Sequence, residues 1–234
     1  MDVLVINGSP RRDRGQTARL ASLFTDGMRE AGANVEFLYS KGLKINDCRG
    51  CFNCWGNTPG ECIQKDEMSG VLDQIAKADI LVLATPVYVD GMTGSLKTLI
   101  DRTIPLLHGR FEIRDDHCRH PIRSYVKGGK MVLLSVAGYH EADNFDSLVH
   151  HVQAISKNMN REYAGAILRP IAWAMSGAKE QGVLVDDIYD AIKEAGRELI
   201  TTGSMKDETL ATISREYIPR DIAVQLMRSF YQDI

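Results

Sequence analysis

Five short apolar segments alternate with segments of helical periodicity along the 234-residue chain. The apolar segments are rich in β-branched residues, which is typical of strands buried on both faces of a sheet. These strands are expected over residues 2–8, 34–40, 79–88, 130–138 and 163–170. Helices are expected over residues 15–31, 66–78, 94–107 and 143–159, and two or three more over residues 183–230.

This alternation constrains the fold. Short buried strands that alternate with helices predict a parallel sheet with right-handed crossovers and helices on both faces. The chain is therefore predicted to form a doubly wound α/β domain over residues 1–203, with a C-terminal helical extension over residues 204–234. Residues 108–128 show no clean periodicity and are expected to form a long loop or a small excursion.

Composition and charge exclude several classes of protein. The formal net charge is −3 and the isoelectric point is about 6.1, so the chain has no basic footprint for nucleic acid and no polybasic membrane anchor. No apolar run approaches the roughly 20 residues that a membrane-spanning helix needs. The first residues, MDVLVINGSP, lack the features of a secretory signal. A cytoplasmic location is expected, where thiols stay reduced.

Four of the five cysteines gather in one segment, residues 44–62. The candidate ligands are Cys48, Cys51, Cys54 and Cys62. Their spacing, C-x2-C-x2-C-x7-C, begins like the bacterial ferredoxin motif, but the last gap is longer and Ile63 replaces the terminal proline. Three interpretations stay open: a [4Fe–4S] cluster, a zinc site, or unligated redox-sensitive thiols. Zinc fits this spacing poorly, because its sites usually pair two separate knuckles.

The loop after the first strand, GSPRRDRGQTARL, predicts an anion site. Small residues let backbone N–H groups turn inward, and a helix N-terminus follows directly, so a phosphate could bind there. The side chains that can add hydrogen bonds or charge are Ser9, Arg11, Arg12, Gln16 and Thr17. The dinucleotide fingerprint GxGxxG and the P-loop motif GK[ST] are both absent. The alternative is an ordinary strand-to-helix turn.

The loop after the third strand lies in ATPVYVDGMTGSLKTLIDR, residues 84–102. Pro86 holds the preceding residue extended, and Gly91 permits close backbone approach. With Tyr88, such a loop can present backbone amides and an apolar floor to a flat ring. The alternative is a plain turn whose Tyr88 packs on a neighbouring helix.

These two loops and the cysteine segment between them resemble the flavodoxin-like NAD(P)H-dependent FMN reductases, and more narrowly the iron–sulfur flavoproteins of the multimeric flavodoxin branch. The resemblance implies a five-stranded sheet of order 2-1-3-4-5 with FMN at the switch point between strands 1 and 3. It implies that FMN contacts Ser9, Arg11, Gln16, Thr17, Pro86, Val87, Tyr88, Val89, Gly91, Ala137, Gly138 and Tyr139. Gln16 is a departure, because such loops commonly carry Asn there; the same hydrogen bonds can form. The resemblance also implies that the four clustered cysteines hold a [4Fe–4S] cluster.

The implied function is an FMN-dependent oxidoreductase with NAD(P)H as co-substrate and a quinone, flavin or one-electron acceptor, either a small molecule or a redox protein. No acid–base residue is expected, because the flavin carries the chemistry. The alternatives are a non-catalytic electron carrier and a redox-sensing FMN module whose cysteines switch its assembly. The family also implies a homodimer or homotetramer. A candidate contact helix carries Ile222, Leu226, Met227 and Phe230; packing of these side chains within the chain explains them equally well.

The remaining candidate ligands have simpler explanations. Cys118 lies between His117 and His120, but no fourth partner is evident and a polar surface loop explains the three residues equally well. His150 and His151 lie on a predicted helix and are expected to face solvent or to cap it.

Overall fold

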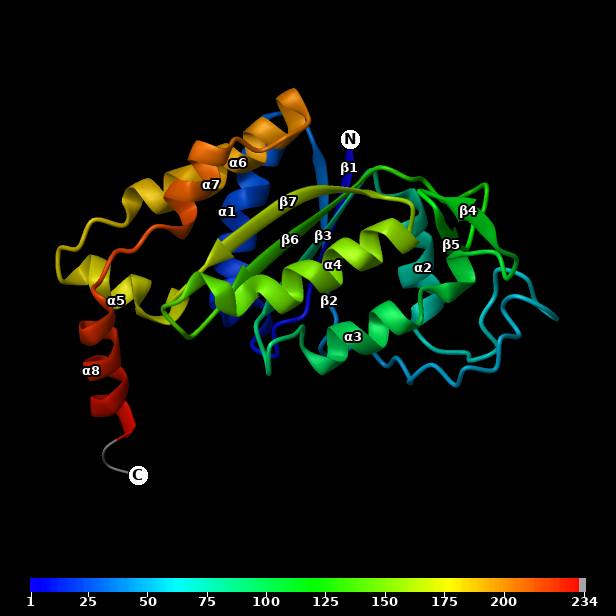
Figure 1. The fold of residues 1–234 in the computed structure, drawn as a ribbon, viewed down its shortest axis with the longest axis horizontal. Coiled ribbons are helices and arrows are strands. Elements are labelled where there is room, and N and C mark those ends of the chain that lie inside the picture. Colours follow the sequence, from blue (N-terminus) through cyan, green and yellow to red (C-terminus); the bar gives the residue numbers. More distant parts are fainter. Residues whose placement is uncertain (232–234) are drawn as a thin grey trace.

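The computed structural model describes residues 1–231 and contains the parallel sheet that the sequence predicts (Figure 1). Its strands are β1 (Asp2–Asn7), β2 (Asn34–Tyr39), β3 (Ile80–Pro86), β6 (Lys130–Val136) and β7 (Glu162–Arg169). They lie in the order β2-β1-β3-β6-β7, and all neighbours are parallel. This is the predicted order 2-1-3-4-5, so the flavodoxin-like fold is confirmed. Residues 232–234 of the predicted extension lie outside the described residues.

Eight helices are described. They are α1 (Gln16–Glu30), α2 (Met68–Lys77), α3 (Gly94–Asp101), α4 (Asp146–Asn158), α5 (Met175–Glu180), α6 (Asp186–Thr202), α7 (Asp207–Ser214) and α8 (Arg220–Tyr231). None of the helices in residues 1–231 is long and apolar enough to cross a membrane.

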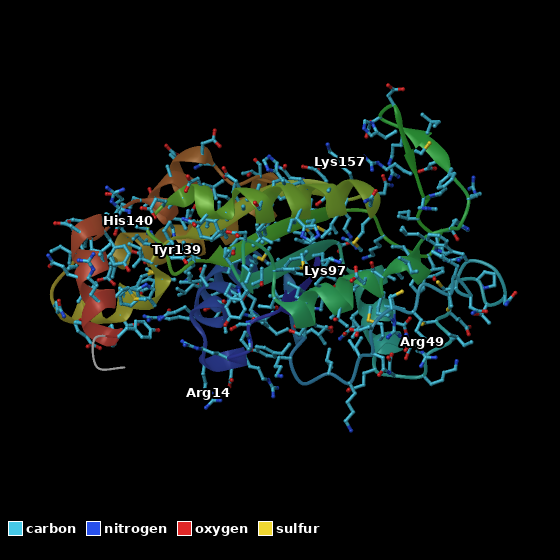
Figure 2. The ribbon with its side chains drawn as sticks, turned by 60° about the horizontal axis from the view of Figure 1, so that its bottom comes forward. Arg14, Arg49, Lys97, Tyr139, His140 and Lys157 are labelled. Atoms are coloured by element: carbon cyan, nitrogen blue, oxygen red, sulfur yellow. The ribbon has the colours of Figure 1, made fainter. Side chains whose placement is uncertain are left out.

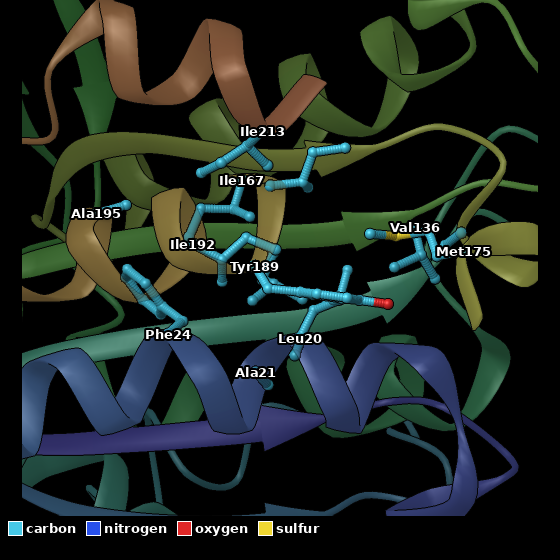
Figure 3. Close-up of a cluster of buried hydrophobic side chains, with 14 of the residues drawn as sticks. Leu20, Ala21, Phe24, Val136, Ile167, Met175, Tyr189, Ile192, Ala195 and Ile213 are labelled. Carbon is cyan, nitrogen blue, oxygen red and sulfur yellow. The ribbon is translucent and has the colours of Figure 1, made fainter. Parts of the chain in front are cut away.

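The sheet separates two hydrophobic layers because successive side chains of a strand point to opposite faces. On β1, Val3 and Val5 belong to one layer, whereas Leu4 and Ile6 belong to the other. The first layer is covered by α1, α5, α6 and α7 (Figure 3). The second is covered by α2, α3 and α4. The strands therefore read as continuous apolar runs, which explains why the sequence predicted them well.

Helices α1 and α6 approach each other at two glycines. A Cβ on Gly27 would lie 1.8 Å from the Lys193 carbonyl oxygen, and a Cβ on Gly196 would lie 1.9 Å from the Phe24 carbonyl oxygen. Both contacts are with backbone, which cannot move aside as a flexible side chain can. The two glycines thus permit the close helix pair over the sheet.

Two parts of the chain show detail that the sequence did not specify. Residues 108–128, expected to form a long loop or a small excursion, contain an antiparallel hairpin, β4 (Glu112–Arg114) and β5 (His117–Arg119). Its turn residues Asp115 and Asp116 both have positive φ, at 53° and 57°, where Asp is tolerated but gives a weaker signal than Gly. Helix α3 ends at Asp101 rather than near residue 107, and Pro105 lies in a separate short turn.

The segment after α6 packs onto the sheet edge. Buried Arg169 at the end of β7 donates to the carbonyl oxygens of Ile213 (2.5 Å) and Arg215 (2.9 Å). The Tyr217 hydroxyl donates to the Ile171 carbonyl oxygen at 2.5 Å. Helix α8 then extends away from the body beyond α5 (Figure 1).

We predict that Gly27→Ala lowers the free energy of unfolding by about 3 kcal/mol, because the new methyl group forces α1 away from α6. The control is Gly70→Ala in α2, where an added Cβ meets nothing within 4 Å of the described atoms. This control should instead stabilise the protein by about 1 kcal/mol through helix propensity. Urea unfolding measures both, and a Gly27→Ala protein as stable as wild type would contradict the close packing.

Candidate functional site

The loops after β1 and β3 meet at the carboxyl edge of the sheet. Thr93 Oγ1 donates to the Gly8 carbonyl oxygen at 2.7 Å, and the Thr93 backbone N–H donates to Thr85 Oγ1 at 3.3 Å. A Cβ on Gly8 would lie 2.8 Å from both Thr93 Oγ1 and Leu96 Cβ, so this approach requires glycine. The two predicted loops therefore form one crevice.

The first loop presents buried polar groups at the N-terminus of α1. Ser9 is 4% exposed and Thr17 is 1% exposed, whereas Arg11 is exposed. The Ser9 N–H donates to Asn7 Oδ1 at 2.8 Å, and the Arg11 N–H donates to Ser9 Oγ at 3.3 Å. These contacts shape a compact turn in front of the helix, as an anion site needs.

Two buried amide atoms in this region have no hydrogen-bond partner among the described residues. They are Asn7 Nδ2 and Gln16 Oε1. Buried polar atoms are normally paired, so an unpaired one at the edge of a crevice suits a ligand. Rotation of the Gln16 amide would present its nitrogen instead. Asn7 was not among the sequence candidates, although its signal was visible as the one polar residue ending the apolar run VLVI.

The second loop turns back on itself. Tyr88 and Gly91 exchange backbone hydrogen bonds of 2.9 and 3.1 Å, and the Val87 N–H donates to the Val136 carbonyl oxygen at 2.9 Å. Val89 has φ of 47°, which is rare for a β-branched residue, and is 99% exposed. Tyr88 is 50% exposed. Pro86 is the last residue of β3, and the other four predicted residues of this loop follow it in the chain.

The third loop leaves β6 beside the second. The Ala137 N–H donates to the Arg169 carbonyl oxygen at 3.1 Å, and Trp173 Nε1 donates to the Gly138 carbonyl oxygen at 3.0 Å. Tyr139 is 69% exposed. Figure 2 shows Tyr139 toward the same end of the molecule as Arg14 of the first loop. Three loops distant in sequence thus converge on one edge with exposed aromatic rings.

A hollow of about 1040 Å³ adjoins the first loop on the outer side of α1. It is bordered by Gly15 and Gln16 and by the charged residues Arg14, Arg19 and Lys179. Arg19 is held by Ser176, whose Oγ accepts from its Nη1 at 2.6 Å. The first loop is therefore accessible from two sides.

The four clustered cysteines line a second site. Cys48, Cys51, Cys54 and Cys62 are free thiols that border one small cavity of about 20 Å³. Burial, reinforced by the other three thiols, raises the pKa of Cys54. Hydrogen bonding from Asn53 lowers the pKa of Cys51.

Zinc ions and iron–sulfur clusters can both be held by four thiolates, but they need different arrangements of the sulfur atoms. Within residues 1–231, no three His, Cys, Asp or Glu side chains converge closely enough to hold a single metal ion. A zinc ion needs four ligands at about 2.3 Å from one centre. A cluster has several iron atoms between its thiolates, so it needs the thiols arranged around a larger cavity. The set of four thiols fits a cluster, whereas the described residues hold no convergent set for a single ion.

A buried ion pair forms one wall of the cysteine cavity. Arg102 is 1% exposed, and its two Nη atoms donate to Asp66 at 2.8 and 3.0 Å. Its Nη1 also donates to the Asn46 carbonyl oxygen at 2.6 Å, and its Nη2 donates to Cys62 Sγ at 3.3 Å. The guanidinium lowers the pKa of Asp66 to about 2, so this carboxylate stays ionised near neutral pH. Arg102 was not recognised from the sequence.

A second arginine and an aromatic column support the cysteine segment from outside. Arg123 donates to the carbonyl oxygens of Cys54 (3.0 Å) and Pro105 (2.7 Å). Trp55 stacks between Phe52 and His120, with ring centroids 5.0 and 4.4 Å away.

The other candidate ligands do not join this group. His120 lies in the aromatic column, where Nδ1 donates to the His108 carbonyl oxygen at 2.9 Å. Cys118 and His117 are exposed on β5. On α4, His150 is exposed, and burial lowers the pKa of half-buried His151.

The crevice and the cysteine cavity lie at opposite ends of α3. Thr93 before the helix contacts the first loop, and Arg102 after it contacts Cys62. Figure 2 shows the same separation, with Tyr139 toward one end, Arg49 of the cysteine segment toward the other, and Lys97 of α3 between them.

Known proteins resemble this chain in sequence and in fold. An iron-sulfur flavoprotein of Archaeoglobus fulgidus is 34% identical over 129 residues, which cover 55% of this chain and 62% of that protein. The chain spans about half to three-fifths of the length of curated relatives of this kind.

Two solved structures share the fold at low sequence identity. The FMN-dependent NADH-azoreductase of Bacillus anthracis has a TM-score of 0.62 at 15% identity, covering 86% of this chain and 99% of that one. The NAD(P)H:quinone oxidoreductase of Methanothermobacter marburgensis has a TM-score of 0.61 at 16% identity, covering 85% of this chain and 96% of that one.

The family pattern described as NADPH-dependent FMN reductase matches residues 1–118, which include β1, the first loop, the cysteine segment, β3 and its loop, and α3. On this match, the chain belongs to the NADPH-dependent FMN reductase family.

Proposed function

We propose that this protein is an FMN-dependent oxidoreductase that moves electrons between NAD(P)H and a quinone, flavin or one-electron acceptor. The observation that carries the proposal is the crevice where three loops meet, beside two amide side chains that each have one buried atom without a hydrogen-bond partner in the described residues. These amides, in Asn7 and Gln16, lie next to the N-terminus of α1. Both the family and the names of the relatives support a flavin there.

In this proposal the first loop holds the phosphate of FMN. Ser9 and Thr17 supply hydroxyl groups, Gln16 an amide, and exposed Arg11 a positive charge. The backbone N–H groups at the start of α1 and the helix dipole add further stabilisation of a dianion. Asn7 Nδ2 is a donor without a partner in the described residues, and we assign it to the same anion.

The second and third loops are assigned to the ring. Pro86, Val87, Tyr88, Val89 and Gly91 would lie along one edge, and Ala137, Gly138 and Tyr139 along another. When bound, FMN supplies hydride acceptance from a nicotinamide and return of electrons singly or in pairs. The loops orient the ring, and the exposed side chains of Tyr88 and Tyr139 are available to cover it or a bound acceptor. No acid–base residue is assigned.

The cysteine cavity is assigned to a [4Fe–4S] cluster held by Cys48, Cys51, Cys54 and Cys62. The name of the Archaeoglobus fulgidus relative supports this assignment, as does the fact that all four thiols line the same cavity. When bound, such a cluster supplies single-electron transfer. Phe52, Ile104 and Pro105 line the cavity and would limit the access of water to it.

We further propose that the protein works as a homodimer or homotetramer. The apolar side chains of α8 support a contact surface, because Ile222 is 41% exposed, Met227 37% and Phe230 67%. Ala223 on the same helix is buried against the body.

A second candidate function is a non-catalytic electron carrier that docks to redox proteins. The exposed edge formed by Tyr88, Val89 and Tyr139 favours it, since an accessible edge serves a docked protein as well as a small molecule. The sequence also shows no separate dinucleotide fingerprint.

Anaerobic turnover distinguishes the two functions. The FMN-loaded protein should oxidise NADH or NADPH in the steady state when a quinone is supplied, because the crevice leaves a flavin face open to both. The measurement is the fall of nicotinamide absorbance with and without the acceptor. Absence of turnover with quinone, flavin and one-electron acceptors would favour the carrier.

Thr17→Val should weaken FMN binding about tenfold, because it removes a hydroxyl beside a charged phosphate. Binding of riboflavin, which lacks the phosphate, should change little. Flavin fluorescence titration measures both affinities. Thr25→Val is the control, since it removes another buried hydroxyl from α1 at a position two turns away. Equal loss of FMN and riboflavin binding would argue against the assigned phosphate loop.

Anaerobically reconstituted wild-type protein should hold about four iron and four sulfide per chain. Cys62→Ser should lose most of both, because it removes one of the four cavity thiols. Cys118→Ser should leave them unchanged, since that exposed thiol lies on β5 outside the cavity. Equal iron content in all three proteins would contradict the assigned ligands.

A further inference from the structure

Arg102 makes a contact that its ion pair with Asp66 does not require. Its four Nη protons have four acceptors: both carboxylate oxygens of Asp66, the Asn46 carbonyl oxygen and Cys62 Sγ. The fourth acceptor is a thiol sulfur 3.3 Å from Nη2, on a side chain that borders the cysteine cavity. The three oxygen acceptors already join Arg102 to the cysteine segment and to Asp66, so the contact with sulfur is additional to this role.

The charged side chains that line the cysteine cavity are positive. Its lining includes Arg49 and Arg102, and no carboxylate appears among the described residues that line it. Asp66 lies behind Arg102, where it holds the guanidinium in place with its side chain 5% exposed. The positive end of the pair therefore faces the thiols, and the negative end faces away from them.

We infer that Arg102 is a positioning residue that raises the reduction potential of the cysteine-bound cluster through its hydrogen bond to Cys62 Sγ, with Asp66 as the countercharge that limits this effect. The inference rests on the proposed cluster. It assigns a role to a residue on α3, outside the cysteine segment.

The chemical reason is the change of charge on reduction. One electron, delivered from NAD(P)H through the flavin of the proposed function, makes the cluster and its four thiolates one unit more negative. A fixed cation and a hydrogen bond to a ligand sulfur stabilise that more negative state, as hydrogen bonds to the sulfurs of such clusters are known to do. Burial strengthens the effect, because little water screens the charge.

The test is a redox titration of the reconstituted cluster, followed by visible absorbance and EPR, in four proteins. Arg102→Met removes the cation and should shift the reduction equilibrium about tenfold toward the oxidised cluster, which is about 59 mV for one electron. Asp66→Asn leaves the cation without its countercharge and should shift the equilibrium several-fold in the opposite direction. Asp101→Asn is the matched control on α3, because its exposed pair with Lys97 has no contact with Arg102 in the described structure. Its potential should equal that of wild type.

Opposite shifts are the result that a purely structural role would not give. If Arg102 only tied the segment together, both Arg102→Met and Asp66→Asn would loosen the cavity and move the potential in the same direction. Shifts of the same sign, or shifts no larger than that of Asp101→Asn, would overturn the inference.

Arg102→Lys serves if Arg102→Met fails to fold or to take up iron. Lysine keeps the buried charge but lacks the planar fork that reaches Asp66 and Cys62 together. The reduction potential of the Arg102→Lys protein should lie below that of wild type, by less than the shift of about 59 mV expected for loss of the cation. A potential equal to that of wild type would refute the hydrogen-bond role.

Iron and sulfide analysis of the wild type separates the two possible failures. Wild-type protein without iron refutes the proposed cluster and this inference together. Wild-type protein with a full cluster, whose variants lack the opposite shifts, refutes the inference alone.

Discussion

The hydrogen bond from Thr93 to the Gly8 carbonyl oxygen joins residues 85 positions apart and fixes where both sites can form. It depends on the parallel pairing of β1 with β3, which brings their carboxyl ends side by side. Helix α3 begins after this contact and ends at Asp101, and the next residue, Arg102, forms a wall of the cysteine cavity. One helix, about 12 Å long for eight residues, therefore sets the distance between the crevice and the cysteines.

The buried pair of Arg102 and Asp66 would be a poor choice for stability alone. Removing two charges from water costs free energy that their attraction often fails to recover, and apolar side chains of similar volume often stabilise as well or better. The proposed cluster gives the pair a reason. A cluster held by thiolates would be anionic, and a cation that is held by a buried carboxylate would keep its orientation whether or not the cluster is bound.

Much of the fold could be predicted because its signals are local. The apolar runs of β1 and β3 are buried on both faces, and the turn residues around Gly8 and Gly91 mark the loops. What the sequence could not show depends on tertiary contact. Arg102 and Asp66 lie 36 residues apart in segments that looked like an ordinary helix end and an ordinary helix start. The β4–β5 hairpin was missed because its strands have three residues each and its turn is Asp-Asp.

The segment after α6 supports the third loop of the crevice as well as the hydrophobic core. His140 follows the third loop and donates through Nε2 to the Ile218 carbonyl oxygen at 3.2 Å, while Tyr217 donates to the Ile171 carbonyl oxygen. Trp173, whose Nε1 holds the Gly138 carbonyl oxygen, packs edge-on against Phe230 of α8, with ring centroids 6.0 Å apart. The third loop is thus held from behind by residues near the end of the described chain. These contacts through Trp173 therefore join α8, the proposed contact surface, to the loop assigned to the flavin ring.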